Sequence, residues 1–317
     1  MGGMDPAAAL VPLARLSDQT RAFLAAAKAE STRRAYRSDW THFDTWCHNH
    51  ALEPLPARPE TIALYLTDLA RTHKPATLRR RLTVIHRAHQ TAGMPPPDDP
   101  LIAETWKGIR RTLGTAQKGK RPLLTEDVRA IVRALPDNLQ GTRDRALLLL
   151  GFAGGFRRSE LAALTVEDIV REKDGLVVKL RRSKTDQEGQ GRKVAIPFGS
   201  HPETCPVAAQ RDWLQAAAIG SGPVFREIDR YGRAQAKALH RDSIGLIVKR
   251  AAARIGLDAS QYAGHSLRAG LATQAFMNGA TEVAIMQQTG HRSLATLRKY
   301  IREGSLFRDN PAAKLGL

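Results

Sequence analysis

A short basic stretch with little helical character divides this chain into two long runs of helical periodicity. It reads Gly-Thr-Ala-Gln-Lys-Gly-Lys-Arg-Pro at positions 114–122, and its glycines and proline favour turns over helix. The 317 residues also exceed what most single domains hold. The sequence therefore predicts two domains, at 16–113 and 125–317, with a linker at 114–124 and a disordered, Ala/Pro-rich N-terminus at 1–15.

The first domain is expected to be helical throughout. Tyr36, Trp40, Phe43 and Trp46 recur at the spacing of one helix face, which predicts a helix at 31–49. The Pro-containing segments 73–75 and 94–97 interrupt the pattern that follows. Further helices are expected at 60–72, 76–91 and 101–113.

The second domain is expected to be mostly helical with one β-hairpin. Two runs rich in β-branched residues, 175–182 and 191–197, flank a polar Gly-containing turn at 186–191. Helices are expected at 125–134, 143–152, 158–164, 205–218, 241–255, 266–278, 281–288 and 293–302. The predicted fold class is mainly α, with a small antiparallel sheet in the second domain.

Positive charge dominates the chain. It contains 49 Lys and Arg against 31 Asp and Glu, a net charge of +18. Between residues 71 and 122 the counts are twelve basic and three acidic. A solvated helix face is one interpretation of such a run, but its density favours a surface that binds a polyanion, either nucleic acid or an anionic membrane.

The sequence also suggests where the protein works. The longest apolar stretch, 146–155, is too short to span a bilayer, and the first residues lack the pattern of a secretory signal. Two cysteines, Cys47 and Cys205, do not make a disulfide scaffold and fit a reducing compartment. We expect a cytoplasmic protein without a membrane partner.

Four separated motifs contain the same few residue types. Gly155-Phe-Arg-Arg-Ser-Glu places Arg157 and Glu160 on one helix face, so that the carboxylate can orient the guanidinium. Each motif alone is more often structural than functional, and only their combination on a basic chain is informative. The other three motifs contain Lys184 at the hairpin turn, His265 with Arg268 at a helix start, and His291 nine residues before Tyr300.

With these motifs the sequence resembles the tyrosine recombinase (phage integrase) family, and within it the Cre-like recombinases most closely. The resemblance covers nearly the whole chain after residue 16, including the segment 82–97. It implies a site-specific recombinase that cleaves and rejoins DNA through a covalent 3′-phosphotyrosyl intermediate. The implied catalytic residues are Arg157, Lys184, His265, Arg268, His291 and Tyr300.

The chemistry of these side chains fits that implication. Two arginines can hold the non-bridging oxygens of a phosphodiester and grip more tightly as charge builds up. A phenol is almost wholly neutral at pH 7, so the nucleophile Tyr300 needs nearby cations and a base, for which His265 is the candidate. His291 is the candidate additional donor to the phosphate, Lys184 is expected to protonate the leaving 5′-oxygen, and Glu160 supports Arg157.

No cofactor is expected. The chain has no GxxxxGK[ST] motif for a nucleotide and no carboxylate cluster suited to magnesium, and Cys47-His-Asn-His50 lacks a second pair of metal ligands. A phosphotyrosyl link preserves the energy of the broken bond, so that resealing requires neither ATP nor a metal.

The expected partner is double-stranded DNA with a specific recombination site, held in a C-shaped clamp. The resemblance implies a homodimer on each site and a homotetramer in the synapse. The apolar tail at 306–317 is expected either to dock on a neighbouring subunit or to fold on its own domain. The candidate DNA-binding residues are Lys74, Arg79, Arg80, Arg81, Lys118, Lys120, Arg121, Arg241 and Lys249.

Two other functions fit parts of this pattern. A type IB topoisomerase uses a similar catalytic set but acts as a single protomer without a specific site. A DNA-binding protein with a vestigial site is the other alternative, although the completeness of the catalytic set argues against it.

Overall fold

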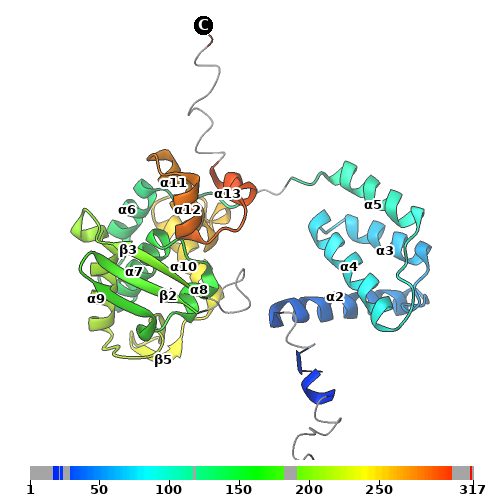
Figure 1. The fold of residues 1–317 in the computed structure, drawn as a ribbon, viewed down its shortest axis with the longest axis horizontal. Helices are drawn as coiled ribbons and strands as arrows, with labels where there is room; N and C mark the ends of the chain where they lie inside the picture. Colours follow the sequence, from blue (N-terminus) through cyan, green and yellow to red (C-terminus); the bar gives the residue numbers. More distant parts are fainter. Residues whose placement is uncertain are drawn as a thin grey trace, which may run out of the picture. The chain divides into compact units, whose positions relative to one another are not determined.

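The chain forms two compact units in the computed structural model, one ending at Lys118 and one starting at Gly119 (Figure 1). The structure describes residues 17–20, 22–23, 29–116, 119–181, 191–301 and 315. The division between the units lies within the stretch that the sequence predicts as a linker. The predictions for 1–15, for most of the 186–191 turn and for nearly all of the 306–317 tail lie outside the described residues.

The first unit contains a bundle of four helices between residues 30 and 113. A proline opens three of them, at a position where its missing N–H costs no hydrogen bond. The aromatic face predicted for the first helix is buried at Phe43 and Trp46 and half-buried at Tyr36 and Trp40, and Phe43 packs against Tyr65. The helices are α2 (Glu30–Asn49), α3 (Pro59–Ala70), α4 (Pro75–Thr91) and α5 (Pro100–Leu113).

The second unit is built around a buried helix, α7 (Leu139–Ala153). The run from Ala146 to Leu150 is almost completely buried, which explains its lack of a polar face. Helices α9 (Pro206–Ala216) and α11 (His265–Met277) pack against it. The prediction of a mainly helical fold is confirmed. The remaining helices are α6 (Thr125–Ala134), α8 (Arg158–Ala163), α10 (Arg241–Arg254), α12 (Glu282–Thr289) and α13 (Leu294–Ile301).

The β-structure is more extensive than predicted. Strand β1 (Ile169–Glu172) extends the expected pair β2 (Gly175–Leu180) and β3 (Arg192–Pro197) into an antiparallel sheet of order β1-β2-β3. A second sheet pairs β4 (Arg226–Ile228) with β5 (Ala234–Ala238). The prediction of one β-hairpin in the second domain therefore misses β1, β4 and β5. Strand β4 has three residues and β5 is Ala-Gln-Ala-Lys-Ala, so neither shows a strand propensity that the sequence alone reveals.

The end of the predicted linker is part of the second unit. The backbone N–H of Arg121 donates to the carbonyl of Gln261, and that of Leu123 donates to the carbonyl of Ser266. Leu123 is fully buried, so this segment is fixed beside the start of α11. None of the helices within the described ranges is long and apolar enough to cross a membrane.

Candidate active site

A hydrogen bond joins the predicted nucleophile to the predicted base. Helix α11 begins at His265. The Nε2 atom of His265 lies 2.7 Å from the hydroxyl of Tyr300 on α13. The hydroxyl of Thr273, also on α11, donates to the backbone carbonyl of Tyr300 at 2.9 Å. A small cluster of buried apolar side chains from α11, α12 and α13 holds α13, which carries Tyr300, beside α11. This geometry allows the imidazole to accept the phenolic proton.

The predicted contact between Arg157 and Glu160 is present at the start of α8. Nη1 of Arg157 donates to Oε1 of Glu160 at 2.7 Å, and its backbone N–H donates to Oε2 at 2.8 Å. The turn before it requires Gly155, whose φ of +58° is costly for other residues. Glu160 is 4% exposed, so a buried carboxylate fixes both the helix start and the guanidinium.

Arg268 is a buried cation with an unused donor. It is 1% exposed, and its Nη1 donates to the carbonyl of Gly155 at 2.7 Å. Its Nη2 is buried without a hydrogen-bond partner among the described residues. Burial, with Arg157 nearby, lowers the pKa of Arg268 to about 10, so it stays charged at neutral pH. A buried charge and an orphaned donor both favour a bound anion.

Two hydrogen bonds of the Thr289 hydroxyl fix the tautomer of the His291 ring. The hydroxyl of Thr289 donates its single proton to the carbonyl of Ile285 at 2.6 Å, and it lies 2.7 Å from Nδ1 of His291. The hydroxyl must therefore accept from Nδ1–H, which leaves Nε2 of the neutral ring without a proton. The ring centroid lies 5.4 Å from that of Tyr300.

The charge state of His291 follows from its surroundings. Burial, then Arg268 and Arg157, lower the pKa of His291 to about 3, so the ring is neutral at pH 7 in this structure. Its predicted role as a donor to phosphate thus carries a condition: Nε2 has to gain a proton when the anion binds.

Arg192, which the sequence analysis did not select, reaches the same site from the start of β3. Its Nη1 donates to the backbone carbonyl of Gln288 at 2.8 Å, and its Nη2 lies 3.7 Å from Oε2 of Glu160. A single arginine at the start of a strand carries no sequence signal of such a role. The predicted catalytic residue Lys184 lies outside the described residues.

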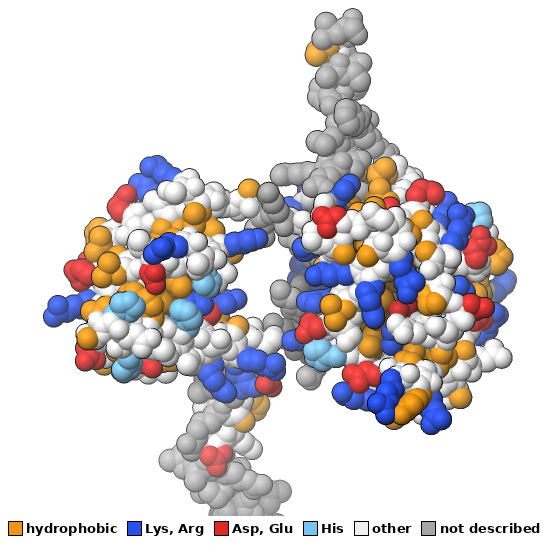
Figure 2. Space-filling model, turned by 180° about the vertical axis from the view of Figure 1, so that it is seen from behind, with side chains coloured by type: hydrophobic (Ala, Val, Ile, Leu, Met, Phe, Trp, Pro, Cys, Tyr) orange, Lys and Arg blue, Asp and Glu red, His pale blue; other side chains and the backbone are white. Residues whose placement is uncertain are grey.

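Most of the predicted DNA-binding residues are exposed. Lysine and arginine side chains are spread over the visible face of each unit (Figure 2). Lys249 is half-buried, and Lys120 donates to the carbonyl of Ser260. Lys118 lies outside the described residues. The exposed candidates are Lys74, Arg79, Arg80, Lys120, Arg121 and Arg241.

The structure contradicts a DNA-facing role for Arg81. This residue is 8% exposed, and its Nη1 lies 2.8 Å from both the Tyr65 hydroxyl and Nδ1 of His42. The neighbouring Arg80 is partly exposed, but it forms a bidentate ion pair with the buried Asp39. Consecutive helix residues point about 100° apart, so three arginines in a row cannot share one face.

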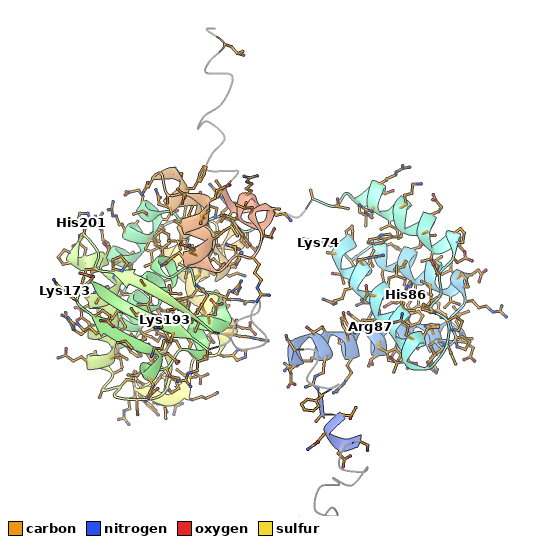
Figure 3. The ribbon with its side chains drawn as sticks, viewed as in Figure 1. Lys74, His86, Arg87, Lys173, Lys193 and His201 are labelled. Atoms are coloured by element: carbon orange, nitrogen blue, oxygen red, sulfur yellow. The ribbon has the colours of Figure 1, made fainter. Side chains whose placement is uncertain are left out.

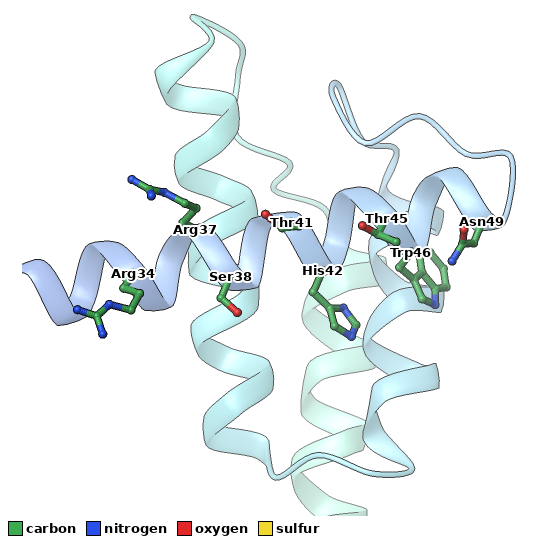
Figure 4. Close-up of a pocket in the computed structure, with 8 residues that line it drawn as sticks. All are labelled: Arg34, Arg37, Ser38, Thr41, His42, Thr45, Trp46 and Asn49. Atoms are coloured by element: carbon green, nitrogen blue, oxygen red, sulfur yellow. The ribbon is translucent and has the colours of Figure 1, made fainter. Parts of the chain in front are cut away.

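The polar face of α2 forms a groove that the sequence analysis missed. Its volume is about 590 Å³, and hydroxyl, amide and guanidinium groups line it together with the rings of His42 and Trp46 (Figure 4). The signal was present as small polar and basic residues at helical spacing, on a side of the helix that borders the aromatic stripe at Trp46. The lining residues are Arg34, Arg37, Ser38, Thr41, His42, Thr45, Trp46 and Asn49.

Residues 121–305 match a family model described as the phage integrase family. An integrase/recombinase xerD homolog of Selenomonas ruminantium is 40% identical over 301 residues, which is 93% of this chain and 88% of that protein. The recombinase Cre of Escherichia phage P1 is 24% identical, over 86% of this chain and 84% of its own length.

The fold has solved counterparts. A lambda integrase dimer bound to a core site has a TM-score of 0.62 at 19% identity, over 91% of this chain and 95% of that one. A XerH recombinase bound to a difH substrate after cleavage has a TM-score of 0.60 at 18% identity, over 81% and 72%. At such identities the likeness concerns the fold. Within the described residues, no three His, Cys, Asp or Glu side chains gather as a metal site.

Proposed function

Because the chain belongs to the phage integrase family, whose members cleave and rejoin DNA, we propose that it is a site-specific recombinase acting through a covalent 3′-phosphotyrosyl intermediate. The observation that carries this proposal is the 2.7 Å contact between His265 Nε2 and the Tyr300 hydroxyl, beside the buried cation of Arg268. We also propose that it acts in the cytoplasm, as a bacterial, phage or plasmid-type protein; the bacterial relative supports this.

In the cleavage step, the Tyr300 oxygen attacks phosphorus as its proton passes to Nε2 of His265. The bond between phosphorus and the 5′-oxygen breaks, and a bond between phosphorus and the tyrosine oxygen replaces it. Lys184 is the proposed donor of the proton that the leaving 5′-oxygen requires. Reversal of the same steps, with a 5′-hydroxyl from another strand, rejoins the DNA.

The arginines stabilise the charge of the five-coordinate phosphorus. Arg157 is oriented by Glu160, and Arg268 keeps one buried donor unused, so neither has to reorganise when the phosphate arrives. Such preorganised donors stabilise the transition state more than the ground state. The incoming negative charge also raises the proton affinity of His291, which then donates from Nε2.

Neither ATP nor a metal is needed in this scheme. The phosphotyrosyl ester conserves the bond energy that hydrolysis would release, and the charge that a metal ion would offset falls on guanidinium groups.

A Tyr300→Phe variant tests the proposal. With a nicked suicide substrate, the wild-type protein is expected to form a covalent protein–DNA adduct on a denaturing gel, and the variant is expected to bind the DNA without forming it. Tyr231→Phe, which alters an exposed tyrosine on the same unit, is the matched control and should form adducts normally. Adducts in Tyr300→Phe would refute the nucleophile assignment.

We further propose that α2 contacts the DNA through the groove shown in Figure 4. Arginines suit phosphates, and hydroxyl and amide groups add hydrogen bonds without charge. Arg37→Gln should weaken DNA binding several-fold and reduce the slope of log affinity against log salt by about 1. Arg33→Gln, exposed on the same helix but paired with Glu30 outside the groove, is the control. An equal slope change in both variants would contradict a specific groove contact.

The proposed assembly is a homodimer on each recombination site and a homotetramer in the synapse. Each chain offers one nucleophile, and exchanging two duplexes requires four strand cleavages. The lambda integrase counterpart bound to its core site as a dimer supports the first half of this proposal.

A further inference from the structure

Arg192 joins three parts of the candidate site that are distant in sequence. From the first residue of β3 it binds the carbonyl of Gln288, at the C-terminal end of α12, and approaches Glu160 on α8. The side chain of Gln288 adds to this junction, because its Nε2 donates to the carbonyls of Ala153 and Ala195, both at 3.0 Å. The turn that carries His291 begins two residues later, so Arg192 fixes its starting point.

The fit around Arg192 is close. Gly290 caps α12 in the left-handed region with a φ of +68°, and a Cβ at this position would lie 2.9 Å from Nε of Arg192. Glycine is therefore required by the backbone and by the guanidinium together. The path of the chain into His291 depends on this contact.

The charges around Arg192 are unbalanced. Arg157, Arg192 and Arg268 are within electrostatic reach of one another, and Glu160 forms ion pairs with Arg157 and Arg192 and attracts Arg268. Within the described part of the chain, these three guanidinium groups and one carboxylate amount to an excess of two positive charges. Nε and Nη2 of Arg192 are buried and lack hydrogen-bond partners among the described residues, although the side chain is 20% exposed. Packing of β3 on α12 alone does not call for a half-buried cation with two buried donors, which a neutral side chain could replace at lower cost.

We propose that Arg192 is a positioning residue for the cleavage reaction, which holds Glu160, and through it Arg157, from one side and the His291 turn from the other. The third positive charge also matches the second negative charge that a phosphodiester acquires on becoming five-coordinate. This inference rests on the proposed function, since it assumes that the site cleaves DNA.

The test is a double-mutant cycle on the full-length protein. Single-turnover cleavage of a nicked suicide substrate is measured at saturating protein, together with DNA affinity and the melting temperature. Arg192→Gln should reduce the cleavage rate about 10- to 100-fold, because small misplacements of catalytic groups cost that much. DNA affinity should change less than threefold. In a protein that already carries Glu160→Gln, Arg192→Gln should reduce the cleavage rate less than about threefold, because Arg192 acts partly through Glu160.

Two further variants complete the test. Lys193→Gln changes the neighbouring, exposed position of β3 (Figure 3) and should cleave within twofold of wild type. Arg192→Lys keeps the positive charge but loses the forked donors of the guanidinium, so it should cleave at a rate between those of wild type and Arg192→Gln. If Arg192→Gln has a lowered melting temperature, Arg192→Lys takes its place in the double-mutant cycle. Wild-type rates in both Arg192 variants, or additive effects of Arg192 and Glu160, would overturn the inference. Absence of cleavage by the wild-type protein itself would instead refute the proposed function.

Discussion

Each unit buries a cluster of arginine, tyrosine and histidine around one carboxylate, and the two clusters differ in how their charges are balanced. In the first unit Asp39 pairs with Arg80 and lies 3.7 Å from Nε of Arg81. Arg81 also bonds to Tyr65 and His42, so two arginines share one carboxylate in this cluster. In the second unit one carboxylate, Glu160, faces three arginines.

The tyrosines of the two clusters are in correspondingly different environments. Burial raises the pKa of Tyr65 to about 12, and the nearby Arg81 offsets this only in part. That phenol holds its proton and serves as a hydrogen-bonding group between helices. Tyr300 is half-buried, and its hydroxyl meets a ring nitrogen that can accept a proton. The same residue types therefore link helices around Asp39, where one positive charge is in excess, and form a site for an anion around Glu160, where a third arginine adds to the excess.

Arg268→Gln should show the largest effect. Loss of one preorganised charged donor is expected to slow single-turnover cleavage about 100- to 1,000-fold. Since the arginine charge is buried without a carboxylate of its own, the melting temperature should not fall. Rates come from the suicide substrate and stability from thermal unfolding. A variant that cleaves normally but melts early would give Arg268 a structural role, like that of the cluster in the first unit.

Arg81→Met should show the opposite pattern. The change leaves Asp39 paired with Arg80 but removes the buried hydrogen bond to Tyr65 and the contact with His42, and is expected to lower the free energy of unfolding by about 2 kcal/mol. Cleavage by the folded protein at low temperature should stay within twofold of wild type. Urea unfolding and cleavage at 10 °C measure the two quantities. A large loss of cleavage in a protein that remains stable would mean that the first cluster also acts on the DNA.

A smaller effect concerns pH. The pKa of His291 is about 3 in the folded protein, whereas the pKa of an unfolded histidine is about 6.5. Between these pH values His291 is protonated in the unfolded chain and neutral in the folded one. Stability is therefore lost as the pH falls through 6.5 towards 3, by about 2–3 kcal/mol at pH 4.5.

The comparison of wild type with His291→Gln isolates this contribution. The pKa values of His42 and His86 are also lowered, mainly by burial, and their effects are common to both proteins. Between pH 7 and pH 4.5, the free energy of unfolding measured with urea should fall less in His291→Gln than in wild type. Equal losses would mean that His291 is protonated in the free protein and needs no bound anion to become a donor.

Local patterns allowed much of this molecule to be predicted from its sequence. Helices are visible where one face is apolar, as in α2, and the Arg157–Glu160 contact follows from helical spacing within a single turn. The nearness of His265 to Tyr300 was expected only because the whole set of motifs resembles a known family. Spacing along the chain does not bring these two residues together.

Features that depend on packing between distant segments were not predictable. Arg81 was misjudged because a run of three arginines does not reveal which one faces the core. Arg192 was missed because its role exists only where β3 meets α12. The β4–β5 pair was missed because its hydrogen bonds, rather than its side chains, define it.

The close approach of Arg192 to Gly290 limits which substitutions these two positions can accept during evolution. A shorter side chain at 192 would free space at 290, yet the left-handed backbone there would still disfavour other residues. The two positions therefore do not compensate for each other, and a random library should keep glycine at 290 even where arginine at 192 has been lost.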